Sequence, residues 1–390
     1  MNPSLVFIAA ALFTWGMGEG MFVYFQSIYL EKLGADPLAI GSILGAMGLA
    51  MMLSHIPAGH ISDKFGRRPL LIAAWSLGVV ATTMMASASG LPPFVAGLIL
   101  YGFTAFVVSP LNSYVTAARG KWSVGRALSL MSATYNLGAV LGPVAGGWIG
   151  GTFGPRRIFA VSAVVFVLST LLIFFIKPQP LDRHDPEAPP ERLWRNRRYL
   201  GFIALVFVVV LSLYLPQPLT PNFLQGQRGL SLEQIGLLGT FAMLGNAVIG
   251  FAFGTLFSPR KGFLLGQVLS AVFAILIWRG TGLPLFALAY FLLGGFRASR
   301  PMAAAQAREL VHESQMGLAY GMNETLGALA LTLAPILAGV LYNLSPDLVY
   351  PVSLGLIGMA FVLTLWFAPR SASQPAGADE REGSTSAAQD

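Results

Sequence analysis

Long apolar runs, separated by short polar segments, dominate the chain. Twelve of these runs have about the length that crosses a bilayer as a single helix, which is near 20 residues. The runs cover residues 4–30, 38–58, 69–89, 93–116, 127–151, 157–177, 199–224, 232–256, 262–280, 283–306, 317–342 and 346–368. Outer-membrane barrels instead show short alternating strands, a pattern this sequence lacks. We therefore expect an all-α membrane protein with twelve transmembrane helices.

Two polar segments divide the chain. Residues 178–198 are charged and rich in proline, as in a solvated linker, and residues 369–390 are small and polar, as in a disordered tail. Both segments are expected on the cytoplasmic side. The predicted organisation is an N-terminal six-helix bundle (1–177), a cytoplasmic linker (178–198), a C-terminal six-helix bundle (199–368) and a cytoplasmic tail (369–390).

The two halves also resemble each other in sequence. An ungapped alignment places Gly41 opposite Gly236, and a second one places Pro143 opposite Pro335. Secondary transporters are commonly built from such repeats, with the substrate site near the bilayer midplane between them. The repeat predicts two pseudo-symmetric bundles.

Composition and charge support a membrane location. Of 390 residues, 55% are hydrophobic and 11% charged, against about 25% charged in soluble domains. The predicted loops on the side of both termini hold seventeen Lys and Arg, against five on the other side. This excess assigns the termini to the cytoplasm of a bacterial-type inner membrane. The net charge of +7 is then explained without nucleic acid, and the absence of cysteine excludes disulfides and thiolate metal sites.

The segment "GHISDKFGRRPLL", between the second and third runs, resembles the signature loop of the major facilitator superfamily. In that family the loop latches the cytoplasmic ends of the two halves together when the transporter is open to the outside. The resemblance implies the family's twelve-helix fold and alternating access over the whole chain. It assigns a gating or structural role to Gly59, Asp63, Gly66, Arg67 and Arg68.

A second segment, "GAVLGPVAGG" in the fifth run, resembles an element associated with the drug:proton antiporters of this superfamily. Its small residues allow close helix packing, and its proline bends a helix. Packing elements of this kind also occur in importers. Leu98 stands where those antiporters usually carry an arginine, so the usual proton relay is not implied. The matching residues are Gly138, Gly142, Pro143, Gly146 and Gly147.

Glu19 lies near the middle of the first run, where a charge is costly and rarely kept without a function. At helical spacing it shares a face with Trp15, Phe22, Val23 and Gln26, as expected for a helix that faces a central cavity. A carboxyl in a cavity that alternates between wet and dry can load and release a proton. The alternative is a carboxyl satisfied by a neighbouring helix for packing alone.

Two arginines and a second glutamate also lie well within runs, away from their ends. Arg300 and Glu324 are at similar depth, which predicts an ion pair with a structural or gating role. Arg297 lies deeper, nearer to Glu19. It is expected to bind an anionic group of the substrate or to hold Glu19 ionised, unless backbone carbonyls satisfy it.

Further polar residues are candidates for the cavity wall, although each is individually more typical of a helix–helix hydrogen bond. Three prolines (Pro216, Pro218, Pro221) predict that the seventh helix breaks near its outer end. The polar candidates are Asn112, Asn136, Tyr214 and Gln217.

Together these features predict a proton-coupled secondary transporter that exports a small amphipathic or drug-like molecule, with lipid, substrate and protons as its partners. The alternatives are transport of an anionic metabolite or lipid through Arg297, and a non-transporting membrane sensor on the same fold. No nucleotide loop, catalytic cluster or metal site is recognisable, so no enzyme activity and no cofactor are expected. A monomer is the expected functional unit.

Overall fold

The computed structural model describes residues 2–179, 193–311 and 316–369, with the backbone alone for residues 55–65, 125, 194, 316–318 and 320. Throughout these residues every regular element is a helix. Ten of the described helices are long and apolar enough to cross a membrane. The prediction of an all-α membrane protein is therefore confirmed.

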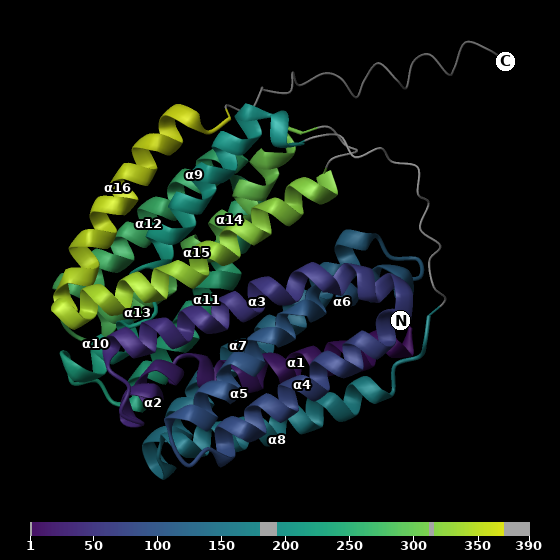
Figure 1. Ribbon diagram of the computed structural model, residues 1–390, viewed down its shortest axis with the longest axis horizontal. Coiled ribbons are helices and arrows are strands. Elements are labelled where there is room, and N and C mark those ends of the chain that lie inside the picture. Colours follow the sequence, from purple (N-terminus) through teal and green to yellow (C-terminus); the bar gives the residue numbers. More distant parts are fainter. Residues whose placement is uncertain (1, 180–192, 312–315, 370–390) are drawn as a thin grey trace.

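The first half of the chain forms one bundle (Figure 1). Its elements are α1 (Pro3–Val23), α2 (Gln26–Lys32), α3 (Pro37–Phe65), α4 (Arg67–Ser87), α5 (Leu91–Phe103), η1 (Thr104–Val107), α6 (Val108–Ala118), α7 (Val124–Phe153) and α8 (Pro155–Phe174).

The second half forms the other bundle. Its elements are η2 (Leu193–Arg195), α9 (Arg197–Tyr214), α10 (Thr220–Gly226), α11 (Leu232–Leu256), α12 (Pro259–Arg279), α13 (Leu283–Leu292), α14 (Gly294–Arg308), α15 (Met316–Leu344), η4 (Pro346–Leu348) and α16 (Val349–Phe367).

Several expected spans are interrupted. The seventh breaks between Tyr214 and Thr220, as its prolines predicted, because proline removes a backbone donor and clashes with the preceding turn. The first also breaks, after Val23, and the tenth breaks at Leu293, although both were expected to be continuous. Neither of these breaks contains a proline. The fourth span passes through the 3-10 turn η1.

The two halves meet along two equivalent contacts, α7 with α11 and α3 with α15. A side chain at Gly236 would collide with the carbonyl oxygen of Pro143, and one at Gly41 would collide with that of Pro335. These are the residues that the two sequence alignments place opposite each other. The internal repeat is thus realised as paired glycine–proline contacts across the interface between the halves.

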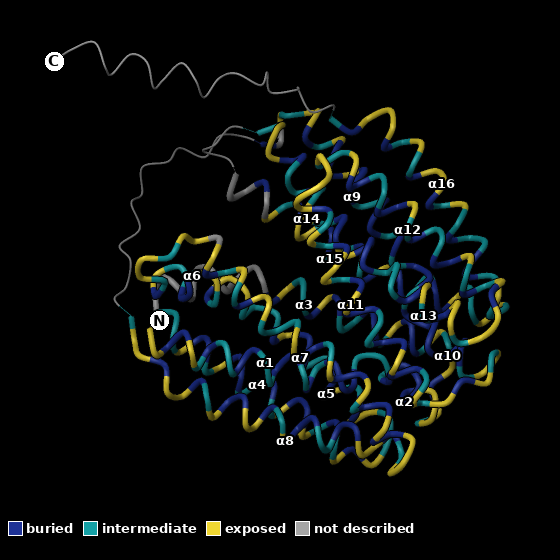
Figure 2. The backbone as a smooth tube through the Cα atoms, turned by 180° about the vertical axis from the view of Figure 1, so that it is seen from behind, coloured by how far each residue is buried: buried dark blue, intermediate teal, exposed yellow. Residues whose placement is uncertain are grey.

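The halves are joined at the end where α2 and α10 lie and diverge toward the end where α6 ends and α15 begins (Figures 1 and 2). At the joined end, Asn222 Nδ2 donates to the Ser27 carbonyl oxygen at 3.2 Å and to Glu31 Oε2 at 2.5 Å. Between α7 and α11, Thr240 Oγ1 donates to the Val140 carbonyl oxygen at 2.9 Å. The described bundles are therefore closed at the end of α2 and α10 and open at the other end.

Candidate functional site

Helices α1 and α7 touch backbone to backbone, and glycine makes this contact possible. A side chain at Gly138 would collide with the Phe13 carbonyl oxygen, and one at Gly142 with that of Met17. Gly146 meets the backbone one turn further along α1, at Met21. These three glycines of the "GAVLGPVAGG" segment therefore let the fifth span lie directly against the first, as small residues do in membrane helices. The fourth, Gly147, instead packs against Leu232 and Gly236 of α11 in the other half.

This close contact brings α7 to Glu19. The hydroxyl of Tyr135, one turn before Gly138, donates to Glu19 Oε2 at 3.0 Å. Glu19 is half-buried. Throughout the described residues no Lys, Arg or His side chain lies within ion-pair distance of its carboxylate. A neutral donor thus holds the carboxyl of Glu19.

Glu19 lines a cavity of about 410 Å³ inside the first bundle, within the size range of small-molecule pockets of about 300–1,000 Å³. Among the described residues that line this cavity, Glu19 carries the charge, and most of the others are aromatic or aliphatic. The cavity reaches Asn112, an exposed residue on α6 toward the open end. Its other main lining residues are Trp15, Trp75, Tyr101, Met47, Met51 and Met131.

The aromatic wall is held in place by packing and hydrogen bonds. The ring centroid of Trp15 lies 5.1 Å from that of Trp75 and 4.5 Å from that of Phe166. Trp75 Nε1 donates to Ser169 Oγ at 2.9 Å, and Ser169 donates onward to the Ala11 carbonyl oxygen at 2.7 Å. The wall is therefore preorganised around Glu19.

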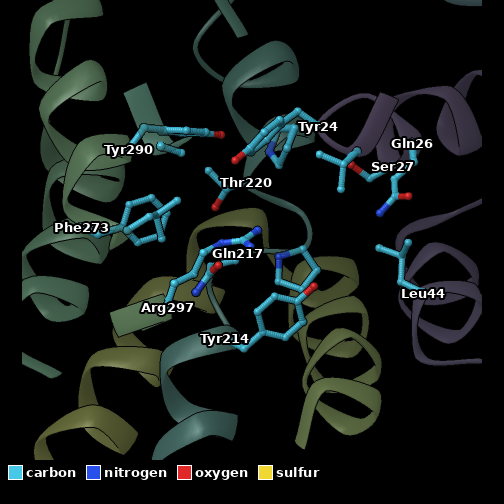
Figure 3. Close-up of a pocket in the computed structure, with 15 residues that line it drawn as sticks. Tyr24, Gln26, Ser27, Leu44, Tyr214, Gln217, Thr220, Phe273, Tyr290 and Arg297 are labelled. Carbon is cyan, nitrogen blue, oxygen red and sulfur yellow. The ribbon is translucent and has the colours of Figure 1, made fainter. Parts of the chain in front are cut away.

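A second pocket of about 110 Å³ lies where the first, seventh and tenth spans are interrupted (Figure 3). Broken helices with a site between the repeats are a recurring feature of secondary transporters. The break in the first span places Tyr24 and Gln26 in the wall, and the break in the seventh places Gln217 and Thr220 there. Arg297, in the first turn of α14, lies among them.

Arg297 is exposed to this pocket. Among the described residues it has no hydrogen bond, and no carboxylate lies within ion-pair distance of its guanidinium. The hydroxyl groups of Tyr24, Tyr214 and Tyr135 all lie within electrostatic range of its charge. Tyr135 is also the donor to Glu19, so one tyrosine neighbours both charges.

The cavity residues proposed from sequence line two different pockets, except for Asn136, which lines neither. Trp15, Asn112 and Glu19 line the aromatic cavity, whereas four other candidates line the smaller pocket. Asn136 lines neither and donates to Ser132 Oγ, one turn away on its own helix, at 3.3 Å. The four residues of the smaller pocket are Gln26, Tyr214, Gln217 and Arg297.

The expected stripe along the first helix is not continuous. Phe22 is fully buried in the core of the first bundle, where its ring centroid lies 5.1 Å from that of Tyr101. The helix breaks after Val23, so helical spacing no longer applies at Gln26. Because the stripe assumed one unbroken helix, it placed Phe22 wrongly, and the break turns Gln26 toward a different pocket from that of Glu19.

Arg300 and Glu324 form an ion pair with 2.6 Å between Arg300 Nη2 and Glu324 Oε2. The side chains are 34% and 58% exposed, so water screens the pair. The two residues belong to α14 and α15, both in the second bundle. The pair therefore joins two helices of one half in this conformation and does not bridge the halves.

The signature loop is tied to the first bundle by its two arginines. Arg68 donates from Nε to the Ile176 carbonyl oxygen at 2.7 Å, at the end of the sixth span, and Arg67 Nη1 donates to Gln179 Oε1 at 3.1 Å. Gly66 precedes α4 as its N-cap residue, with a φ of +84°, a conformation that favours glycine. At Gly59 and Asp63 only the backbone is described, so their predicted gating role lies outside the described side chains.

Two tyrosines of the site, Tyr135 and Tyr24, were not predicted from sequence, although the sequence contains a signal for Tyr135. Tyr135, Gly138 and Gly142 share one helix face at spacings of three and four, so the face that packs on α1 could have been extended to Tyr135. Asn136 was chosen instead and lies about 100° further around the helix. Tyr24 had no such signal, because the break beside it follows from tertiary packing.

Comparisons with known proteins agree with this architecture. The sequence profile of the Major Facilitator Superfamily matches residues 7–216 and 202–389. Tetracycline resistance protein, class C, of Escherichia coli is 25% identical over 365 residues, covering 88% of this chain and 91% of that protein. Multidrug resistance protein 2 of Bacillus subtilis strain 168 is 22% identical over 357 residues, covering 87% and 89%. A crystal structure of the nucleoside transporter NupG has the same fold, with a TM-score of 0.75 at 14% identity, over 94% of this chain and 98% of that one.

Proposed function

Since this chain belongs to the Major Facilitator Superfamily and is a membrane transporter, we propose that it exports small amphipathic molecules in exchange for protons. Two relatives of similar length carry the names of a multidrug and a tetracycline resistance protein, which supports export. In this proposal the linker, both termini and the open end face the cytoplasm of a bacterial-type inner membrane. The protein works as a monomer and needs no cofactor.

The observation that carries the proposal is the environment of Glu19. Its carboxyl lies in a mainly apolar aromatic cavity and accepts a hydrogen bond from the neutral hydroxyl of Tyr135. With no basic partner at ion-pair distance among the described residues, the carboxyl is free to change its protonation state as the cavity hydrates and dries. A carboxylate locked to an arginine would be much less able to do so.

The sign of the coupling follows from charge. In the open conformation Glu19 releases its proton to the cytoplasm, and the ionised carboxylate favours a substrate that is cationic or polar at that end. After the halves rock to expose the other side, a proton from outside neutralises Glu19 and weakens the hold on the substrate. Proton and substrate thus compete for one carboxyl, and competition for one site produces exchange in opposite directions.

Flux into proteoliposomes tests the proposal. A panel of amphipathic dyes is followed with and without an imposed pH gradient, for the wild type, for Glu19→Gln and for Glu309→Gln as a matched control. Glu309 is an exposed carboxylate at the end of α14, outside both pockets. We expect the gradient to accelerate transport in the wild type and in Glu309→Gln but not in Glu19→Gln. If gradient-driven transport were undiminished in Glu19→Gln, Glu19 would not be the proton carrier.

Arg297 favours a second candidate, the transport of an anionic metabolite by uptake or exchange. An anion at Arg297 would favour protonation of Glu19, so the proton and the anion would travel in the same direction. The same flux assay separates the two cases: accumulation of an anion in the direction of the proton gradient supports this candidate, and expulsion against that direction supports exchange.

A further inference from the structure

The two pockets carry opposite charges that do not neutralise each other. From this we infer that the substrate is a zwitterionic amphiphile, with its cationic group at Glu19 in the aromatic cavity and its anionic group at Arg297 in the small pocket. The inference rests on the proposed function and names the substrate class of the same site.

The anionic half of the site is built around Arg297. Arginine cannot lose its charge, and Arg297 is exposed to the pocket, so water solvates its guanidinium until a ligand supplies a charged partner. No carboxylate of the chain supplies one among the described residues, whereas the hydroxyl of Tyr24, a neutral group that can donate a hydrogen bond, lines the same wall. A volume of about 110 Å³ suits one carboxylate, sulfonate or phosphate group and not a drug-sized body.

A further buried atom points to a polar ligand beside Arg297. Gln26 Oε1 is buried and, within the described structure, has no hydrogen-bond partner. Gln217 lies in the same wall, with its Nε2 donating to the Leu213 carbonyl oxygen at 2.7 Å. Buried polar atoms of this kind are normally satisfied, and Gln26 Oε1, which accepts hydrogen bonds, marks where a water or a donor group of the ligand binds beside the anionic group.

The cationic half of the site is the aromatic cavity. Trp15, Trp75 and Tyr101 line it together with the Glu19 carboxylate, and aromatic rings with an acid are the groups that bind organic cations. Methionine side chains complete an adaptable apolar wall. At about 410 Å³ the cavity can hold the body of the substrate as well as its cationic group.

The charges of the two pockets lie near enough to be felt at one side chain. Tyr135 donates to Glu19 in the aromatic cavity and lies within electrostatic range of Arg297. A substrate with one charge would pair with one of these groups and would displace water from the other without replacing it, which costs free energy. A substrate with both charges compensates both groups at once, and this difference is the source of specificity.

Transport of a zwitterion in exchange for a proton would move net charge across the membrane. If a zwitterion of zero net charge leaves while a proton enters at Glu19, positive charge moves inward. Export of a zwitterion is therefore driven by a negative-inside membrane potential as well as by the pH gradient, whereas one-for-one exchange of a monovalent cation for a proton is electrically silent.

Three molecules with one scaffold test the inference by isothermal titration calorimetry near neutral pH. They are norfloxacin, which is a zwitterion, its ethyl ester, which is a cation, and its N-acetyl derivative, which is an anion. The proteins are the wild type, Arg297→Gln, Glu19→Gln, and two controls outside both pockets, Arg279→Gln and Glu309→Gln. Arg279 stacks on Trp278, with its guanidinium carbon 4.0 Å from the ring centroid, and serves to control for the loss of an arginine.

We expect the wild type and both controls to bind norfloxacin about tenfold or more tightly than either singly charged derivative. Arg297→Gln should erase the advantage over the ester and keep the advantage over the N-acetyl derivative. Glu19→Gln should do the reverse. The inference would be overturned if the wild type bound all three molecules equally or if Arg297→Gln weakened the binding of all three equally. It would also be overturned if none of the three bound saturably.

The failure of this inference can be told from failure of the proposed function. The calorimetry reports charge preference without a gradient, and the flux assay reports proton coupling with any transported dye. Proton-driven flux that depends on Glu19, together with no preference for the zwitterion, overturns the inference alone. Preference for the zwitterion without proton-driven flux overturns the exchange mechanism alone.

Discussion

The hydroxyl of Tyr135 donates to Glu19 Oε2 across 3.0 Å, and it joins the fifth span to the acidic residue of the aromatic cavity. The donor is neutral, so the carboxyl keeps the freedom to gain or lose a proton. The glycines that follow Tyr135 on the same helix face bring α7 close enough for this hydrogen bond. Packing and chemistry at this site therefore depend on one helix contact.

Removing this donor should shift the pH dependence of transport. In Tyr135→Phe the Glu19 carboxyl loses a hydrogen bond, which at a charged group contributes about 1.5–3 kcal/mol. The pH profile of transport should therefore differ from that of the wild type. Flux measured across a pH series checks this.

Tyr342→Phe is the control for the Tyr135 variant. Tyr342 is half-buried on α15 and lines neither pocket. Its pH profile should match that of the wild type. A Tyr135→Phe profile that overlays the wild type would show that the hydrogen bond has no role in coupling.

The contact between α1 and α7 should be intolerant of a single methyl group. In Gly138→Ala the new Cβ collides with the Phe13 carbonyl oxygen, a backbone atom that cannot rotate away. We expect a loss of about 1–3 kcal/mol, seen as a lower midpoint of thermal denaturation in detergent, together with weaker proton coupling. Gly355→Ala, on the open face of α16, should leave both unchanged, because no atom lies within 4 Å of its new Cβ. An unaffected Gly138→Ala protein would contradict the packing role.

The Arg300–Glu324 pair should contribute little to stability. Both side chains are substantially exposed, so a double-mutant cycle should give a coupling free energy of at most about 1 kcal/mol. Reversal of either charge alone should impair transport if the pair aligns α14 with α15, and the double reversal Arg300→Glu with Glu324→Arg should restore it. If the double reversal did not restore transport, Arg300 and Glu324 would not act in transport through their ion pair.

The closed end should depend on Asn222. This buried side chain bridges α10 to α2 through the Ser27 carbonyl and the Glu31 carboxylate. In Asn222→Leu both hydrogen bonds are lost, so the population should move toward conformations open at this end. Because the chain has no cysteine, labels introduced at residues 32 and 227 report the distance between the two halves by electron spin resonance.

Asn343→Leu is the matched control for this measurement, since Asn343 is exposed at the end of α15. Its distance distribution should equal that of the wild type. The same distribution in Asn222→Leu would mean that the paired glycine–proline contacts close this end without the hydrogen bonds.

The fold could be predicted from the sequence largely because the bilayer imposes a simple pattern. Each span needs about 20 apolar residues. The prolines from Pro216 to Pro221 predicted the break in the seventh helix. The alignment of Gly41 with Gly236 and of Pro143 with Pro335 anticipated which residues would form equivalent contacts between the halves. Glycine and proline have local requirements that remain visible in the sequence.

The site was less predictable because it depends on how helices are turned and interrupted. Helical spacing identified Trp15 as a neighbour of Glu19, but it failed at Phe22 and beyond, where the break after Val23 changes the direction of the chain. Tyr24 gained its role from that break, which no local residue signals. Glu19 and Arg297 were recognised as isolated charges, but only their positions show that they occupy separate pockets.

Proton release on substrate binding tests the central role of Glu19 most directly. The ethyl ester of norfloxacin, the cationic member of the series, is mixed with purified protein in a weakly buffered solution containing a pH dye. The measurement is repeated over a series of pH values. We predict that the wild type and Glu309→Gln release protons in proportion to the bound ligand, and that Glu19→Gln binds with no release. Equal release from Glu19→Gln would contradict the account.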